Sequence, residues 1–319
     1  MANAMAEIPN VIRKSKKTVW QRILKDRALL LMLALPLAYY ALFHYQPMYG
    51  ILIAFKDYRF KLGIVGSPWT DNHGFWHFVR FFSSQNSWTI IKNSLLLSVW
   101  SLICGFPAPI ILAIILNECK LRRFKKVVQT VSYMPHFISV VAIVGMMTLL
   151  LSPRDGAINN VIKSLGLEPI YFMAETRWFR PVYVISNIWQ GTGFGAIIYL
   201  AALAGVSQEL CEAATIDGAS RLQRIWHVSI PGILPTITIL LILSAGNIMD
   251  VSFEKTLLMQ NGLNISVSEV IDTFVYKVGL LGGEFSYSTA VGLFKTTVGL
   301  IMLVTVNKIS SWISETALW

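Results

Sequence analysis

The segment from Glu212 to Gly218 combines two carboxylates, of which Asp217 is the second, with two alanines and a glycine, and it lies between two strongly apolar stretches. Its residue types favour a short helix, in which Glu212 would lie near the positive end of the helix dipole. Ala213 and Ala214 keep the surface of that helix small, so that another protein can approach closely. Gly218 permits a turn that a residue with a Cβ atom would resist. The chemistry predicted here is charge pairing and close docking in water.

The polar connection that contains this helix covers residues 206–230, which we call the docking segment. A second short helix is expected from Ser220 to His227, with Arg221 exposed, and Pro231 suits the first turn of the next apolar stretch. The alternative is an ordinary polar loop between two helices. That alternative explains the charge of the segment, but not why so long a connection is helix-prone and small on one side.

A second set of polar and aromatic residues falls inside the apolar stretches. An Asp or Lys at the middle of a bilayer costs on the order of 2.5–3.5 kcal/mol, so such residues should face a cavity or a partner. Amides, carboxylates and aromatic rings are also the groups that sugar hydroxyls and ring faces require. The set comprises Tyr133, Asn187, Trp189, Gln190, Asn247, Asp250 and Lys295.

Within this set, Trp189 and Gln190 are the preferred candidates for contact with a transported solute. Asp250 and Lys295 have an alternative role, because they could simply pair with each other. If the solute is an acidic saccharide, Lys295 would supply its counter-charge, and Lys295→Met would depress uptake of an anionic oligosaccharide more than that of a neutral one. The glycines around residue 193 are expected to allow close helix packing.

The composition is that of an integral membrane protein. Of 319 residues, 55% are hydrophobic and only 14% are charged, and the mean hydropathy is +0.58. A soluble domain has about a quarter of its residues charged. Since a spanning helix needs about 20 apolar residues, the sequence predicts an all-α protein with several spans. The six apolar stretches cover approximately residues 28–43, 88–116, 127–151, 181–205, 231–253 and 287–309.

Basic residues set the expected orientation. Much of the net charge of +10 lies beside apolar stretches, so it predicts helix orientation rather than a nucleic-acid partner. Residues 1–27 form a basic segment, and residues 120–126 are strongly basic as well, which places both in the cytosol. With six spans, the docking segment and the C-terminus then also lie in the cytosol. Residues 28–319 are expected to form one six-helix domain surrounded by membrane lipid.

The docking segment resembles the EAA loop of binding-protein-dependent ABC importers, written E-A-A-x3-G-x9-I-x-L-P. Glu212, Ala213, Ala214, Gly218 and Pro231 match outright, and Val228 and Ile230 stand in for Ile and Leu. The stretch from Tyr133 to Ser139 is similar to a signature of permeases for complex or oligomeric saccharides. By resemblance, the chain looks like a permease subunit of the maltose-permease-like group of sugar importers, similar to those for oligosaccharides and for polysaccharides such as alginate.

The resemblance implies the type I importer architecture in the bacterial cytoplasmic (inner) membrane, with a cytoplasmic EAA coupling helix. It implies a second homologous permease, two ATP-binding subunits that use ATP and Mg, and an extracytoplasmic solute-binding protein. Glu212 would contact a basic residue in a groove of the ATPase, and Gly218 would form the turn of the loop. The solute would be an oligosaccharide or polysaccharide that crosses the membrane by alternating access.

No catalytic motif is recognisable in the sequence. It has no Walker A loop of the G-x4-G-K-[ST] type, so we expect no bound cofactor or metal and no enzymatic activity of the chain by itself. An ion-coupled secondary transporter of small solutes is an alternative, but it would show internal repeats, which are not seen. A membrane enzyme is another, and only His73 and His77 have a spacing that could hold a metal, provided that their stretch is helical.

Overall fold

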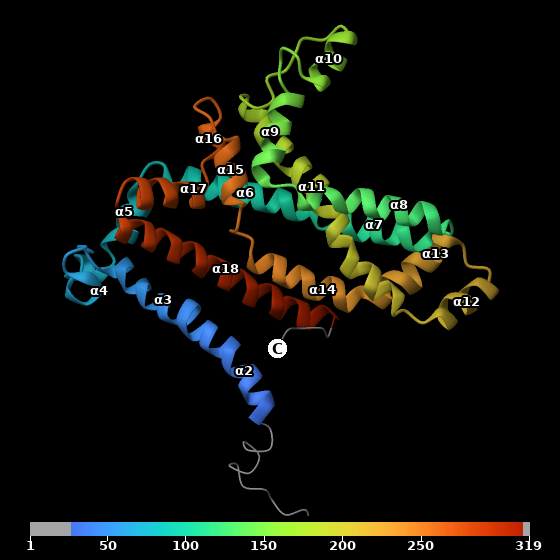
Figure 1. The fold of residues 1–319 in the computed structure, drawn as a ribbon, viewed down its shortest axis with the longest axis horizontal. Coiled ribbons are helices and arrows are strands. Elements are labelled where there is room, and N and C mark those ends of the chain that lie inside the picture. The colour runs from blue at the N-terminus through green and yellow to red at the C-terminus, as the bar shows by residue number, and fades with distance from the viewer. Residues whose placement is uncertain (1–26, 315–319) are drawn as a thin grey trace, which may run out of the picture. The chain divides into compact units, whose positions relative to one another are not determined.

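The computed structural model describes residues 27–314, and all regular secondary structure in that range is helical (Figure 1). The one β-type pairing among these residues is an isolated bridge between Lys56 and Trp69. This confirms the predicted all-α class. The predicted basic segment, residues 1–27, lies outside the described residues except for Arg27.

The chain divides into two compact units. The first ends at Leu52 and the second begins at Ile53. The described part of the first unit belongs to a run of helical turns that continues to Phe55, three residues into the second unit. It consists of α2 (Arg27–Tyr40), a π-helical turn (Ala41–Tyr45), α3 (Gln46–Met48) and a 3-10 helix (Tyr49–Phe55). The run is 29 residues long and apolar, which is enough to span a bilayer.

The second predicted span agrees with the structure, whereas the third is broken. Helices α6 (Ser87–Gly105) and α7 (Pro107–Glu118) form one run of 32 residues. The third stretch consists of α8 (Arg122–Tyr133) and α9 (Val140–Leu150), which are bent by 102°. The helix stops between them because a 3-10 turn around Pro135 is followed by extended backbone. Ser139 then begins α9, and its hydroxyl accepts the Ala142 N–H at 3.3 Å.

The remaining spans match the prediction except at their ends. Helix α11 runs from Thr176 to Ala204, and α18 runs from Phe285 to Ser314. Helix α14 (Ile230–Gly246) ends before the predicted Phe253, and the segment after it is irregular. Among the described residues, four helices are long and apolar enough to cross a membrane. The number rises to six if each bent pair of helices counts as one span.

The predicted connections contain several short helices. Between the first two spans lie α4 (Gly63–Gly66), a 3-10 turn (Asn72–Gly74) and α5 (Trp76–Ser83). Helix α10 (Ala157–Ser164) follows α9. Four helices lie between α14 and α18: α15 (Phe253–Met259), α16 (Ile265–Ser268), α17 (Ile271–Val275) and a π-helix (Tyr276–Leu281).

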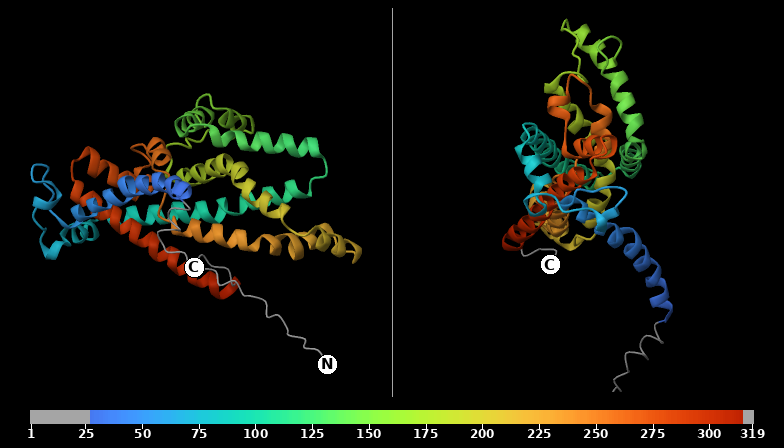
Figure 2. Two further views of the ribbon diagram at one scale, coloured as in Figure 1. Left: turned by 60° about the horizontal axis from the view of Figure 1, so that its bottom comes forward. Right: turned by 90° about the vertical axis from the view of Figure 1, so that its left-hand side faces the viewer.

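Helix α11 is central to the second unit, because it packs against α6, α7, α8 and α14. The two short helices of the docking segment, α12 (Gln208–Ile216) and α13 (Arg221–Arg224), lie together at one end of these long helices. Helices α5 and α17 lie at the opposite end (Figures 1 and 2). The long helices therefore separate the docking segment from these short connecting helices.

The close packing of α11 on α8 depends on Gly193. A Cβ atom built on Gly193 would overlap the main-chain carbonyl of Ser132, whereas nothing lies within 4 Å of a Cβ atom on Gly191. The expectation that glycine in this region allows close helix contact is therefore confirmed at residue 193. Because the obstacle is backbone, it cannot be relieved by a change of side-chain rotamer.

We expect Gly193→Ala to lower the stability of the protein by roughly 1–3 kcal/mol, because overpacking would force α11 away from α8. Gly191→Ala is the matched control, and it should be neutral or stabilising by up to ~1 kcal/mol, since alanine is the better helix former. The midpoint of thermal unfolding in detergent measures both. Equal shifts for the two variants would contradict this account of the contact.

Candidate functional site

The docking segment forms an exposed corner in the structure. Helix α12 leaves α11 at an angle of 73°, and it contains no buried residue. The Glu212 carboxylate accepts a hydrogen bond from the Gln208 side chain at 2.8 Å. Glu212 and Ala213 are exposed and Ala214 is half-buried. This helix therefore presents to a partner the Glu212 carboxylate and the small side chains of two alanines.

The turn after α12 has the predicted geometry. Asp217 occupies the C-cap position of α12, and Gly218 follows with φ of +80°, a conformation that residues with a Cβ atom rarely adopt. Arg224 crosses back from α13, and its guanidinium donates to the Thr215 hydroxyl at 3.1 Å. This bond ties the two short helices together, so that the corner is held as one piece.

The second short helix differs in extent from the prediction of Ser220 to His227. Helix α13 begins with Arg221, which is exposed, and its start is stabilised by a capping box between Ser220 and Gln223. It continues through a π-helical turn, Ile225–Ser229, directly into α14. Pro231 lies in the first turn of α14, as predicted. Because proline has no N–H to donate, the wider turn before it accommodates the missing helical bond.

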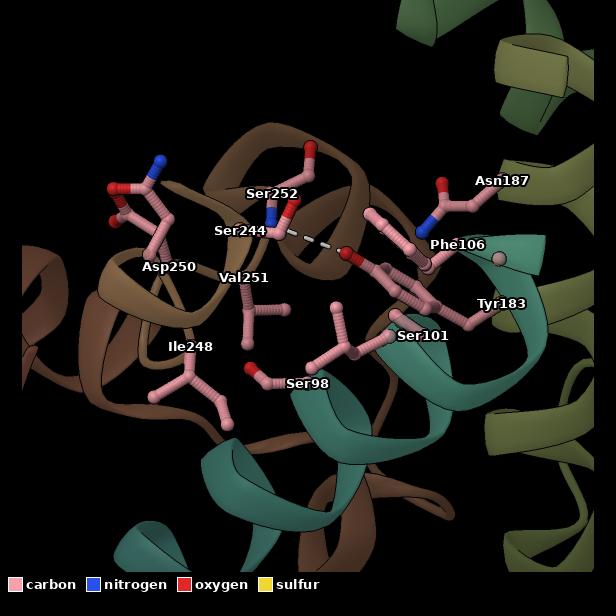
Figure 3. A pocket seen from close by; sticks show the side chains of 13 residues that line it. Ser98, Ser101, Phe106, Tyr183, Asn187, Ser244, Ile248, Asp250, Val251 and Ser252 are labelled. Atoms are coloured by element: carbon pink, nitrogen blue, oxygen red, sulfur yellow. Dashed lines mark hydrogen bonds between the residues drawn. The ribbon is translucent and has the colours of Figure 1, made fainter. Parts of the chain in front are cut away.

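A cavity of about 480 Å³ lies between α6, α11 and the end of α14 (Figure 3). We call it the central cavity. The hydroxyls of Ser98 and Ser101 are buried and have no hydrogen-bond partner among the described residues. The Tyr183 hydroxyl accepts the Ser252 N–H at 3.1 Å. The full lining is Ser98, Ser101, Leu102, Gly105, Phe106, Tyr183, Asn187, Ser244, Asn247, Ile248, Asp250, Val251 and Ser252.

Three of the predicted pathway residues, Asn187, Asn247 and Asp250, line the central cavity. The irregular segment after α14 contributes the last two, and non-helical backbone at membrane depth is tolerated where it lines a cavity. Sequence reasoning identified these residues from one signal, which is a polar side chain within an apolar stretch. In the structure these three residues lie together at the central cavity.

The other predicted residues lie elsewhere. Trp189 is exposed over apolar grooves on another face of α11, and Gln190 donates to the Ile138 main-chain carbonyl at 3.3 Å. Tyr133 is at the end of α8, where the third stretch breaks. None of these three lines the central cavity. The sequence correctly places these polar or aromatic side chains in spans. It does not tell which face of a helix meets the cavity.

Lys295 forms an ion-paired cluster with two aspartates. Its ammonium group donates to Asp250, and it donates to Asp272 at 2.6 Å. The cluster joins the segment after α14 to α17 and α18, and a smaller cavity of about 310 Å³ lies beside Asp250 and Lys295. The pairing alternative for Asp250 and Lys295 is therefore what the structure shows. Asp272 was missed because it lies in a connection rather than in a predicted span.

Lys255 of α15 is a further residue that sequence reasoning missed. Its side chain is 1% exposed, and its ammonium group donates to the Asn187 amide oxygen at 2.7 Å. The same group lies 5.5 Å from the centre of the Tyr183 ring. Burial lowers the pKa of Lys255 to about 8. No carboxylate pairs with Lys255 among residues 27–314, so a cation stands directly behind two lining residues of the central cavity.

The arrangement suits binding and passage of a polar solute. Serine hydroxyls, two amides, a carboxylate and a tyrosine line the central cavity, and these groups can exchange hydrogen bonds with hydroxyls. In the described part of the chain, no group of three or more His, Cys, Asp or Glu residues could hold a metal. His73 lies in a 3-10 turn that precedes α5, and the buried His77 ring contacts the Lys56 carbonyl at 3.3 Å. The two histidines therefore do not share one helix face.

Curated relatives match the chain over nearly its whole length. The polygalacturonan/rhamnogalacturonan transport system permease protein YteP of Bacillus subtilis (strain 168) is 41% identical over 100% of both chains. Protein LplB of the same organism is 43% identical, over 97% of this chain and 96% of its own length.

Solved structures also match. One chain of a bacterial alginate ABC transporter, crystallised with an alginate pentasaccharide-bound periplasmic protein, superposes with a TM-score of 0.86. It is 38% identical, and the match covers 95% of this chain and 100% of that chain. A chain in a second crystal structure, of an ABC transporter that imports the acidic polysaccharide alginate, has the same TM-score at 39% identity and covers 93% of this chain and 100% of that chain.

These matches show that the chain has the fold of an ABC importer permease, which is the membrane-embedded subunit. In such importers, separate subunits hydrolyse ATP. The family model for the binding-protein-dependent transport system inner membrane component matches residues 105–315, which include the central cavity residues from Gly105 onward and the docking segment. The chain belongs to this family and is an inner-membrane permease subunit of an ABC importer.

Proposed function

We propose that the protein passes an acidic oligosaccharide or polysaccharide from a solute-binding protein across the inner membrane by alternating access. The observation that carries the proposal is a cavity lined by hydroxyls and amides in a chain whose full-length relatives include a polygalacturonan permease. The similarity to chains of alginate importers supports it, since polygalacturonan and alginate are both acidic. The family assignment does not favour the alternative of an ion-coupled secondary transporter.

The proposed assembly has the type I architecture, with six spans and with both termini in the cytosol. A second homologous permease and two ATP-binding subunits complete it, and those two subunits use ATP and Mg, so that this chain binds no cofactor itself. The match to an importer chain crystallised with a periplasmic binding protein supports a binding-protein partner. The separation of the docking segment from α5 and α17 supports a cytoplasmic position for the segment (Figure 1).

The docking segment is proposed as the coupling element. Helix α12 would carry the contact with an ATPase groove through Glu212, with Ala213 and Ala214 allowing close approach. Helix α13 continues into α14 as one run of 26 residues from Arg221 to Gly246. A displacement at α12 and α13 would therefore reach the segment that lines the central cavity. Nucleotide can shift the inward–outward equilibrium only through contacts that differ between the two states.

We expect Glu212→Lys to weaken retention of the ATPase subunits by roughly tenfold or more, because breaking a buried interfacial charge pair costs about 2–5 kcal/mol. Uptake should fall with it. Copurification of the ATPase with the tagged permease measures the first effect, and transport by the reconstituted importer measures the second.

Glu118→Lys is the matched control for this experiment. It reverses the charge of a half-buried glutamate at the end of α7, on the side that we predict to be cytosolic but outside the docking segment. It should keep the ATPase bound. Normal ATPase retention and normal uptake by Glu212→Lys would contradict the coupling role.

The preference for an acidic solute is proposed to depend on Lys255 more than on Lys295. Lys295 already pairs with Asp250 and Asp272, so its charge is compensated. Among residues 27–314, the neutral Asn187 amide is the one hydrogen-bond partner of the Lys255 ammonium group. At an effective dielectric constant of ~20, unit charges ~8 Å apart interact by ~2 kcal/mol, which is enough to discriminate an anion in the central cavity.

We expect Lys255→Met to lower uptake of an oligogalacturonate by several-fold to roughly tenfold, relative to a neutral oligosaccharide of equal length, since ~1.4 kcal/mol corresponds to tenfold. Because the pKa of Lys255 is lowered to about 8, the ammonium charge is present at pH 7 and is lost as the pH rises toward 9. The ratio of anionic to neutral uptake by the wild type should therefore fall over this range. The ratio for Lys255→Met should be flat.

Lys295→Met provides the comparison, because it removes a lysine beside the smaller cavity, which shares Asn247 and Asp250 with the central cavity. If Lys295→Met changes the uptake ratio and Lys255→Met does not, the assignment is wrong and the sequence-based role of Lys295 is restored. If neither variant alters the ratio, the charge preference does not depend on either lysine. Coupling to the ATPase would be unaffected by either result, since it depends on the docking segment.

A further inference from the structure

A second groove lies between α6 and α11 and shares no lining residue with the central cavity. Its volume is about 500 Å³, and its walls are mainly aliphatic and aromatic. The two helices run side by side in the same direction, because Asn93 contacts Arg180 near their starts and Gly105 lies beside Ile188 further along. The lining is Trp100, Cys104, Arg177, Arg180, Pro181, Val184, Ile185 and Ile188.

The groove has one charged end and one apolar end. Arg177 and Arg180 lie in the first turns of α11, and Cys104 and Ile188 lie further into the spans. The distance along α11 from Arg177 to Ile188 is ~16 Å at 1.5 Å per residue. Trp100 is 51% exposed and Ile185 is 65% exposed, so the apolar walls are open to whatever surrounds this face. We call this site the arginine groove.

The two arginines carry more positive charge than their neighbours compensate. Arg177 pairs with Glu175 through its Nε, at 2.7 Å, and its side chain is 69% exposed. Arg180 donates one N–H to the Asn93 amide oxygen at 2.9 Å, and no carboxylate pairs with it among residues 27–314. Glu175 pairs with Arg177 alone, so the two guanidinium groups keep N–H donors for an anion at the mouth of the arginine groove.

We propose that the arginine groove binds one anionic phospholipid. The phosphate would lie between Arg177 and Arg180, whose planar donors match phosphate oxygens, and an acyl chain would follow the apolar walls toward Cys104. This ligand matches both ends of the site, because a soluble anion would leave the apolar walls uncovered and an uncharged lipid would leave the arginines without a partner.

The proposal is independent of the transported solute. The central cavity lies on a different face of α6 and α11, and none of its lining residues contributes to the arginine groove. A second permease subunit could instead cover these walls, and the experiment separates the two occupants.

The test uses the whole importer in nanodiscs that contain equal amounts of phosphatidylglycerol and phosphatidylcholine with identical acyl chains. After extraction, native mass spectrometry counts the lipids retained by each complex. The wild type should retain phosphatidylglycerol in preference to phosphatidylcholine. The double variant Arg177→Gln/Arg180→Gln should reduce that preference by roughly tenfold, because charge-assisted hydrogen bonds are about twice as strong as neutral ones. Lys92→Gln, at an exposed lysine of α6 that does not line the groove, should change nothing.

A second pair of variants tests the acyl-chain part without touching the arginines. Cys104→Trp places a large side chain in the groove at an exposed position, and it should abolish the retained lipid. Ile103→Trp is its control, since Ile103 is 60% exposed on the same helix but does not line the groove. Equal retention of the two lipids by the wild type would overturn the proposal, and so would unchanged retention in Cys104→Trp. Loss of the second permease from Cys104→Trp would show that the groove is a subunit interface.

Discussion

A polar group in hydrocarbon must find its partner inside the protein, and this constraint accounts for much of the second unit. Asn93 of α6 donates to the main-chain carbonyls of Ser266 and Glu269 at 2.9 and 3.2 Å, so that the connection before α18 is fixed to a span. The Lys295 ion pairs hold α18 to α17 and to the end of α14. The hydrogen bond from Lys255 fixes α15 to α11. The irregular segments are thus held by the same polar groups that would otherwise be costly in the bilayer.

This tethering gives a physical route between the proposed coupling element and the central cavity. The helical run from Arg221 to Gly246 is ~39 Å long at 1.5 Å per residue, which exceeds the ~30 Å of the hydrocarbon core. It begins at the corner formed with α12, and it ends at the irregular segment that lines the cavity. A rigid helix moves both of its ends together, whereas a flexible loop would dissipate a displacement. The π-helical turn before Pro231 lies within this run, at the end of the docking segment.

The sequence predicted those features that depend on local composition. The apolar stretches, the short helix that contains Glu212 and the left-handed turn at Gly218 all follow from residue type and neighbours. The 102° break of the third stretch and the early end of α14 at Gly246 are less visible, because the mean hydropathy of a stretch does not show where a helix stops within it. The positions around the cavity depend on which face of each helix is covered. Periodicity could not supply this, since helices with apolar residues on all sides show no polar face.

Lys255 illustrates why the cavity could not be read in full from the sequence. It lies in a connection of mixed polarity, where a lysine is usually solvated, and only the return of α15 against α11 buries it. Lys295 had the stronger sequence signal, because it stands within an apolar stretch, yet two carboxylates already satisfy it. A charge in a span is most often paired, since the cost of leaving it unpaired is high. A search for a group that could bind an incoming anion should therefore begin with buried cations that have only neutral partners. Charged residues within the apolar stretches give the stronger sequence signal, but they are the weaker candidates.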